Sequence, residues 1–132
     1  MNLIICLDDK NGYSFASRRQ SKDRVQLERM LELVGERKLY LNSYSSKLFE
    51  SLPDNVVVSD TPQFSAGQDD YCFVENINII STNIDSLIIY RWNRHYPSDK
   101  QLPQELLSGK KLVSSTDFVG HSHEKITEEV YQ

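Results

Sequence analysis

The stretch Leu3-Ile4-Ile5-Cys6-Leu7 (LIICL) is continuously apolar and is followed at once by Asp8 and Asp9. A strand that is covered on both faces has this pattern, because neither face needs polar side chains. The stretch is too short for the core of a signal peptide and has no basic residues before it. We therefore interpret it as the first strand of a buried sheet.

Further segments along the chain have the composition of strands. The short apolar ones cover residues 38–41, 56–58, 71–74 and 86–92. Two more strands are predicted at 111–115 and 125–131, which alternate between polar and apolar residues and would pair antiparallel at a sheet edge. The segment 8–20 is predicted to be a loop with a turn at Asn11-Gly12.

One long helix is predicted over residues 22–34, where apolar side chains recur at helical spacing. Ser21 is its expected N-cap, Asp23 lies in the first turn, and Gly35 follows as C-cap. Shorter helices are expected from the serines at 43–46 to Leu52, at 76–83 and at 102–108. The pattern predicts a single α/β domain, residues 1–132, with a mostly parallel central sheet, flanking short helices and antiparallel C-terminal strands.

The composition excludes several classes of protein. The chain has 132 residues, of which 39% are apolar and 26% charged, as in an ordinary globular domain. Its net charge of −4 argues against a nucleic-acid partner, and no segment has the roughly 20 apolar residues that span a bilayer. Cys6 and Cys72 both fall in predicted strands, which indicates buried thiols in a reducing, cytoplasmic compartment.

Nearly the whole chain resembles dihydrofolate reductase in the order of its segments. "LIICLDDKNG" (3–12) is similar to that family's first strand and turn, and "SKDRVQLERML" (21–31) to its first helix. The other similar segments are "KLYLNSYSSKLFESLP" (38–53), "NVVVSDTP" (55–62), "YCFVENINIISTNIDSLIIYRWNRHYPSDKQLP" (71–103) and "GHSHEKITEEVY" (120–131). The resemblance implies a dihydrofolate-reductase-like fold, with a ligand cleft at the carboxyl ends of the parallel strands.

The resemblance also implies where the family's ligands would lie. An acidic residue in the first helix binds the pterin ring in the family, and Asp23 occupies that place. A Gly-Gly pair ends the family's fourth main strand against NADPH, but this chain has Glu75-Asn76, which would obstruct and repel a pyrophosphate. The phosphate-binding Gly-Arg-Thr is replaced by residues 42–45, where only the hydroxyl of Ser45 remains. Arg19 stands close to the position of a family Trp.

These departures predict a degenerate, non-catalytic domain without a cofactor. It would bind a small molecule or a protein at the former active-site cleft, and its candidate ligand-binding residues are Asp23, Arg19, Ser45, Glu75 and Asn76. For Asp23 a simpler role is also open, as an acid that stabilises the helix start. Arg18 and Arg19 could meet an anionic ligand or lie in a solvated loop. We expect a cytoplasmic, bacterial-type protein, for which a homo-oligomer stays open.

Two alternative functions stay open. One is an NADPH-dependent reductase of a pterin-like substrate with an unusual cofactor mode. The other is an interaction module for nucleic acid, because Tyr90 to Pro97 (YRWNRHYP) interleaves aromatic and basic residues that can stack on bases. The acidic net charge makes a nucleic-acid partner the less favoured of the two.

Two kinds of chemical site are not expected. His121 and His123 form an H-x-H pair, which on a strand would place both imidazoles on one face as zinc ligands. No third ligand follows in a fitting context, so we predict no metal site. We also expect no Ser/His/Asp or Cys/His nucleophile set, because Cys6 and Cys72 are predicted to be buried in strands.

Overall fold

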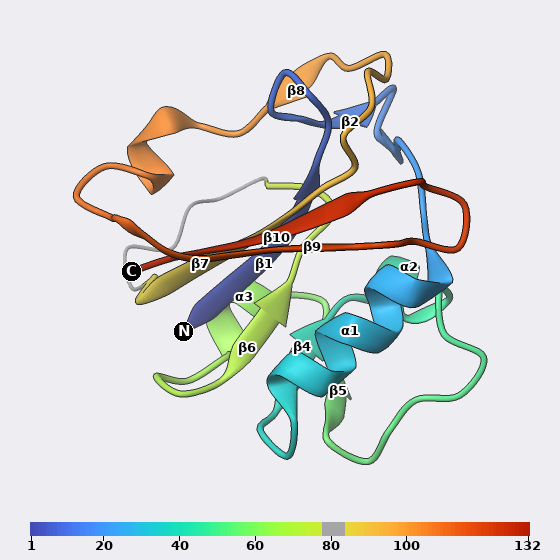
Figure 1. Ribbon diagram of the computed structural model, residues 1–132. Helices are drawn as coiled ribbons and strands as arrows, with labels where there is room; N and C mark the ends of the chain where they lie inside the picture. The colour runs from blue at the N-terminus through green and yellow to red at the C-terminus, as the bar shows by residue number, and fades with distance from the viewer. Residues whose placement is uncertain (78–83) are drawn as a thin grey trace.

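A computed structural model describes residues 1–77 and 84–132, and its main feature is one seven-stranded sheet (Figure 1). Its parallel part runs in the order β5 (Val56–Val58), β4 (Leu39–Leu41), β6 (Tyr71–Phe73), β1 (Asn2–Leu7) and β7 (Ser86–Arg91). β10 (Ile126–Tyr131) and β9 (Leu112–Phe118) follow as antiparallel strands. The predicted parallel centre and antiparallel tail are confirmed.

β1 is covered on both faces, as its apolar sequence predicts. Leu3, Ile5 and Leu7 belong to one buried cluster, and Ile4 belongs to a second cluster on the opposite face. The helix α1 (Arg24–Val34) contributes Leu27, Met30 and Val34 to that second cluster. Figure 1 shows α1 lying along one side of the sheet, beside β4 and β6. Burial of these side chains on two faces holds the parallel strands in register.

The prediction that the segment 8–20 is a loop is wrong. It contains β2 (Gly12–Phe15) and β3 (Arg18–Arg19), which form a small antiparallel sheet with β8 (Lys100–Gln101). The expected turn is present, since Asn11 has a φ of 61°. The strands themselves were missed because they are short and polar, and because β8 lies far along the chain.

The helices differ from the prediction mainly at their ends. Asp23, rather than Ser21, is the N-cap of α1, which begins at Arg24. The second helix, α2 (Ser43–Ser46), ends long before Leu52, and tighter turns follow in which Leu48 N donates to Ser45 O and Phe49 N to Ser46 O. Its N-cap is Asn42, whose side chain accepts a hydrogen bond from Ser45 N at 2.8 Å.

α3 (Pro62–Ser65), η1 (Gln104–Leu106) and the helix predicted at 76–83 complete the comparison. α3 was not predicted. The 3-10 turn η1 lies inside the predicted segment 102–108. The helix predicted at 76–83 falls on residues 78–83, which lie outside the described residues. Of the helices in the two described ranges, none has the length and apolar character needed to cross a bilayer.

Candidate functional site

Three of the five candidate residues meet beyond the end of β6. Glu75 accepts two hydrogen bonds from the guanidinium group of Arg19, with Nε–Oε1 at 2.7 Å and Nη2–Oε2 at 2.9 Å. The buried hydroxyl of Ser45, on α2, donates to Oε2 of the same carboxylate at 2.8 Å. A bidentate pair of this kind is both strong and fixed in direction. The hydrogen bond to Glu75 also raises the pKa of Arg19.

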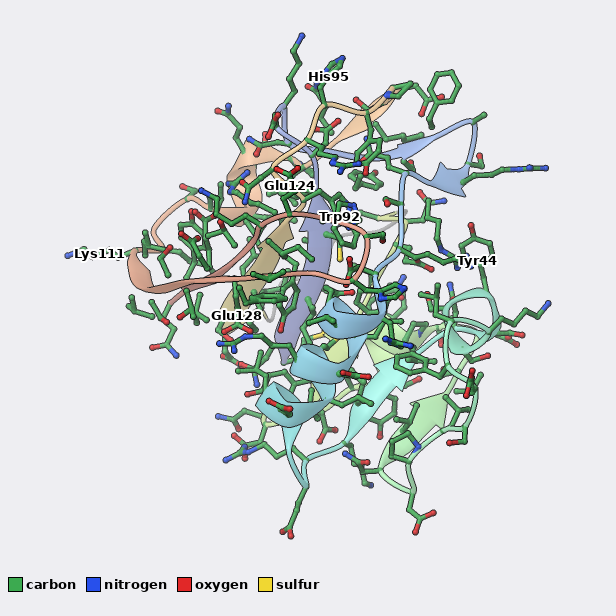
Figure 2. The ribbon with its side chains drawn as sticks, turned by 45° about the vertical axis from the view of Figure 1, so that its right-hand side comes forward. Tyr44, Trp92, His95, Lys111, Glu124 and Glu128 are labelled. Atoms are coloured by element: carbon green, nitrogen blue, oxygen red, sulfur yellow. The ribbon has the colours of Figure 1, made fainter. Side chains whose placement is uncertain are left out.

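Tyr44 holds the other side of Arg19. The guanidinium carbon of Arg19 lies 4.1 Å from the centroid of the Tyr44 ring, as a cation–π contact. The backbone N–H of Arg19 donates to the Tyr44 hydroxyl at 3.2 Å, and Arg19 Nη2 donates to the Tyr44 carbonyl at 3.3 Å. Figure 2 shows Tyr44 at the periphery of the molecule. These contacts join β3, α2 and the end of β6 into one cluster, which we call the Arg19 cluster (Arg19, Tyr44, Ser45 and Glu75).

The Arg19 cluster separates two hollows. The inner cavity has a volume of about 20 Å³ and is lined by Ser21, Gln26 and Trp92 among others. The outer cleft has a volume of about 210 Å³ and is lined by Arg18, Asn42, Tyr44, Asp60, Gln63 and Asn76 among others. Both are also lined by Arg19 and Glu75, so this ion pair forms the wall between them. Asn76, the fourth candidate, therefore faces the outer cleft.

Asp23, the fifth candidate, lies apart from the Arg19 cluster. As N-cap of α1 it accepts hydrogen bonds from Val25 N and Gln26 N, at 2.9 and 3.2 Å. The backbone N–H groups of His121 and Ser122 donate to it at 2.9 and 2.8 Å. Its side chain is 0% exposed and lines neither the inner cavity nor the outer cleft.

The charge of Asp23 is stabilised inside the protein. Burial alone would raise the pKa of Asp23, but hydrogen bonds from the backbone of His121, the ring of His123 and the backbone of Ser122 outweigh it. The pKa of Asp23 is therefore held well below its usual range. The geometry makes Asp23 the anchor of the segment 120–123 on the start of α1.

His123 continues this network beyond Asp23. Its Nδ1 lies 2.9 Å from Asp23 Oδ2, and its Nε2 lies 3.1 Å from Ser21 Oγ and 2.9 Å from the Tyr96 hydroxyl. The ring stacks on Trp92 with 4.5 Å between centroids. A Ser/His/Asp set therefore does come together, and the sequence analysis missed it. No local pattern indicates the set, since Asp23 and His123 are 100 residues apart.

The H-x-H pair is not arranged for metal binding. Residues 121–124 form a bend rather than a strand, so the two imidazoles do not share a strand face. His121 Nδ1 contacts Arg24 Nη2 at 3.4 Å, and both ring nitrogens of His123 have hydrogen-bond partners. In the described part of the chain, no group of three or more His, Cys, Asp or Glu side chains could hold a metal ion.

We predict that protein purified without added metal contains far less than one zinc per chain. A zinc ion at His123 would have to displace Asp23 or Ser21 from the imidazole, and His121 alone is a weak ligand. Elemental analysis of the purified protein would measure this, with a His121→Ala variant as control. Stoichiometric zinc in the unmodified protein that disappears in His121→Ala would contradict the prediction.

The first two aromatic residues of the segment 90–97 are buried, whereas Arg94 and His95 are exposed. Tyr90 is 0% exposed and Trp92 3% exposed, so their rings are not free to stack on bases. Arg91 forms an ion pair with Glu129 on β10. Figure 2 places Trp92 near the middle of the molecule and His95 at its surface. The prediction that nucleic acid is not the partner stays a prediction, which this packing supports.

Neither cysteine is presented as a reactive thiol. Burial raises the pKa of Cys72 to about 12. The pKa of Cys6 is also raised by burial, and the negative charges of Glu75 and Asp23 raise it further. Both residues are free cysteines, and at neutral pH their thiols remain protonated.

No family model matches the chain, and no curated protein matches it either. Among solved structures, the chain is similar to dihydrofolate reductase from Enterococcus faecalis complexed with NADP(H) and RAB-propyl. The TM-score is 0.64, and the alignment covers 99% of this chain and 94% of that one. The chain has a dihydrofolate-reductase-like fold. The sequences are 11% identical, so the similarity shows the fold alone.

The dihydrofolate-reductase-like fold was expected from the order of the segments, and it is confirmed. Within this fold, the carboxyl ends of β4 and β6 meet at the Arg19 cluster. The strand end that carries Glu75-Asn76 is therefore filled by side chains of this chain, with Arg19 from β3 and Ser45 from α2 bound to Glu75.

Proposed function

We propose that this chain is a non-catalytic domain with a dihydrofolate-reductase-like fold that binds a small polar molecule in the outer cleft. The observation that carries the proposal is the ion pair of Arg19 and Glu75, held by Ser45. It occupies the strand end at which the resembling family has glycines. The inner cavity beside it, at about 20 Å³, has room for roughly one water molecule and none for a pterin ring.

The lining of the outer cleft indicates the kind of ligand. Asn42, Gln63 and Asn76 bring amide groups, and Tyr44 adds an aromatic surface that is 42% exposed. The charges of Arg19 and Glu75 neutralise each other. The other charged residues of the lining are one cation, Arg18, and one anion, Asp60, so the cleft has little net charge. A compact ligand that has both donors and acceptors but little net charge suits this lining. A protein segment or a second copy of the chain is the competing occupant.

A thermal-shift panel of pterins, nucleobases, nucleosides and nucleotides tests the proposal. A ligand of the outer cleft raises the unfolding temperature, because it binds the folded state only. Gln63→Ala and Asn76→Ala should each weaken its Kd by up to about tenfold, the effect of one lost hydrogen bond. Gln104→Ala, an exposed glutamine on η1, is the matched control. A ligand whose Kd is the same in all three variants would contradict the proposal that it binds in the outer cleft.

We predict no saturable NADPH binding in the micromolar range and no dihydrofolate turnover. Ser43 replaces the arginine that the resembling family uses for phosphate, which costs about 1.5–3 kcal/mol, and the carboxylate of Glu75 adds repulsion. Together these weaken NADPH by at least about a hundredfold. Calorimetry measures the binding of NADPH, and an absorbance assay of NADPH oxidation measures the turnover of dihydrofolate. A micromolar site, or turnover that a folded Asp23→Asn variant loses, would establish the reductase alternative instead.

A further inference from the structure

Ser21, His123 and Asp23 have the relative positions of a nucleophile, a base and the acid that orients the base. Asp23 Oδ2 lies 2.9 Å from His123 Nδ1, and Ser21 Oγ lies 3.1 Å from His123 Nε2. Because an ionised carboxylate only accepts hydrogen bonds, Nδ1 carries the proton of the neutral imidazole. The lone pair of Nε2 therefore faces Ser21, as general-base catalysis requires.

Two aromatic residues fix this arrangement. Trp92 stacks on the imidazole of His123 with an interplanar angle of 18°. The hydroxyl of Tyr96 donates to Ser21 Oγ at 3.3 Å. When Tyr96 donates its hydrogen to Ser21, the hydrogen of Ser21 can point at His123 Nε2. Tyr96 also lies 2.9 Å from Nε2, so it is a positioning residue that can compete for the same lone pair.

A buried amide without a partner lies beside this set. Gln26, on α1, is 1% exposed, and its Nε2 has no hydrogen-bond partner within residues 1–77 and 84–132. Gln26 and Ser21 line the same inner cavity. Buried donors are nearly always paired, so this one needs an explanation. An unpaired N–H on a residue that lines the same cavity as a nucleophile can stabilise the oxyanion of an acyl-transfer reaction.

A groove lined by both apolar and charged residues adjoins the inner cavity. It lies between α1 and residues 48–51, has a volume of about 510 Å³, and has Leu31 and Phe49 in its lining. Lys22, Leu27 and Leu48 line both the groove and the inner cavity. Ser21 is half-buried and lines the inner cavity, but it does not line the groove. For an ester whose short apolar chain lies in the groove, the carbonyl group would have to extend past Lys22, Leu27 and Leu48 into the inner cavity to meet Ser21.

We propose that Ser21 is the nucleophile of an acyl-transfer site that accepts neutral esters with a short apolar acyl group. Ser21 Oγ forms a bond to the ester carbonyl carbon, and its proton moves to His123 Nε2. The ester C–O bond then breaks, and His123 returns the proton to the leaving alcohol. Water, deprotonated by His123, attacks the acyl-serine, which releases the carboxylic acid and restores the Ser21 hydroxyl. Gln26 Nε2 donates to the oxyanion in both steps.

The site is separate from the outer cleft, so its test is independent of the proposed function. The full chain is treated with diisopropyl fluorophosphate, and the adduct is measured by intact mass and located by peptide mapping. A second assay follows hydrolysis of p-nitrophenyl butyrate. We expect one adduct, on Ser21, together with ester hydrolysis above the uncatalysed rate. Ser21→Ala should lose both, and Ser46→Ala, a half-buried serine on α2, should lose neither.

His123→Gln separates catalysis from a structural hydrogen bond. A lost general base lowers the labelling rate of Ser21 by about 10²–10⁴-fold, whereas a merely structural histidine leaves the rate of a folded variant unchanged. Circular dichroism confirms that each variant is folded. Absence of an adduct in the unmodified protein, an adduct on Tyr96, or equal labelling in folded His123→Gln would overturn the proposal.

Discussion

Asp23→Ala is expected to lower the free energy of unfolding by about 4 kcal/mol. The variant removes the N-cap of α1, which alone stabilises by about 1 kcal/mol. It also leaves the backbone donors of His121 and Ser122, and the ring of His123, without their acceptor. Each buried donor without a partner costs about 1–3 kcal/mol, so the losses add to the largest effect that we expect from one side chain.

Urea denaturation followed by tryptophan fluorescence measures this effect. Trp92 is the single tryptophan of the chain and stacks on His123, so its emission reports on the same region. Asp23→Asn keeps one oxygen acceptor and should lose less than Asp23→Ala. Asp9→Ala, an exposed acid, is the control and should change stability by no more than about 0.5 kcal/mol. A loss below about 1 kcal/mol in Asp23→Ala would contradict the expected role.

The same carboxylate should make stability depend on pH in a defined direction. The pKa of Asp23 is depressed in the folded protein, by hydrogen bonds that outweigh its burial, so the unfolded chain binds the proton more readily. The stabilisation is therefore fully present well above the unfolded value of about 3.9 and is lost as the pH falls below it. The difference between the unmodified protein and Asp23→Asn should shrink over that acidic range. A constant difference would contradict the depressed pKa.

Gly120→Ala is expected to lower the free energy of unfolding by about 2–3 kcal/mol. A Cβ at this position would lie 2.7 Å from Asp23 Oδ2, 2.8 Å from Ile126 Cδ1 and 2.9 Å from the carbonyl oxygen of His123. Two of these atoms belong to fixed parts of the structure, a buried carboxylate and the backbone. The loop must therefore move away from α1, which weakens the hydrogen bonds that His121 and Ser122 donate to Asp23.

Gly67→Ala is the matched control for that substitution. A Cβ at Gly67 would approach Asp70 Oδ2 at 3.2 Å, and this side-chain oxygen, which accepts an exposed hydrogen bond from Gly67 N at 2.8 Å, needs to shift by only a few tenths of an ångström. We expect a change within about 0.5 kcal/mol. Denaturant midpoints of the two variants, measured side by side, provide the comparison. Equal midpoints would mean that the loop at Gly120 can move without a loss of stability, which would contradict its attachment to Asp23.

A strand could be predicted from the sequence where burial of its own residues on both faces makes a short stretch continuously apolar. The residues 3–7 are apolar because β1 is enclosed on both faces, and that pattern is visible in five consecutive letters. α1 is similarly visible from the spacing of Leu27, Met30 and Val34. β2 and β3 were not predicted, since they are short and depend on β8, which pairs with Gly12 and Ser14 from far along the chain.

The candidate site could be predicted only in part, for the same physical reason. Glu75 stands at a strand end where the resembling family has a glycine, and this difference indicated the position of the Arg19 cluster, because a carboxylate at a buried strand end needs a partner. That its partner is Arg19, 56 residues away, follows from the fold and from no local pattern. Asp23 was assigned to a ligand by resemblance. Its helix-start role, which the sequence left open, is the one that the structure shows, and its ligand-binding role stays a prediction. The donors that residues 121–123 add around Asp23 follow from the fold and from no local pattern.

The contact between Asp23 and His123 has a kinetic consequence. It closes a span of 100 residues, and the entropy needed to close a loop grows with its length. We therefore expect this contact to form after the transition state for folding, once β7 and β10 have paired. A contact formed that late governs how fast the native state is lost rather than how fast it is reached. Asp23→Ala should then unfold about a thousandfold faster in stopped-flow experiments, while its refolding rate stays nearly unchanged.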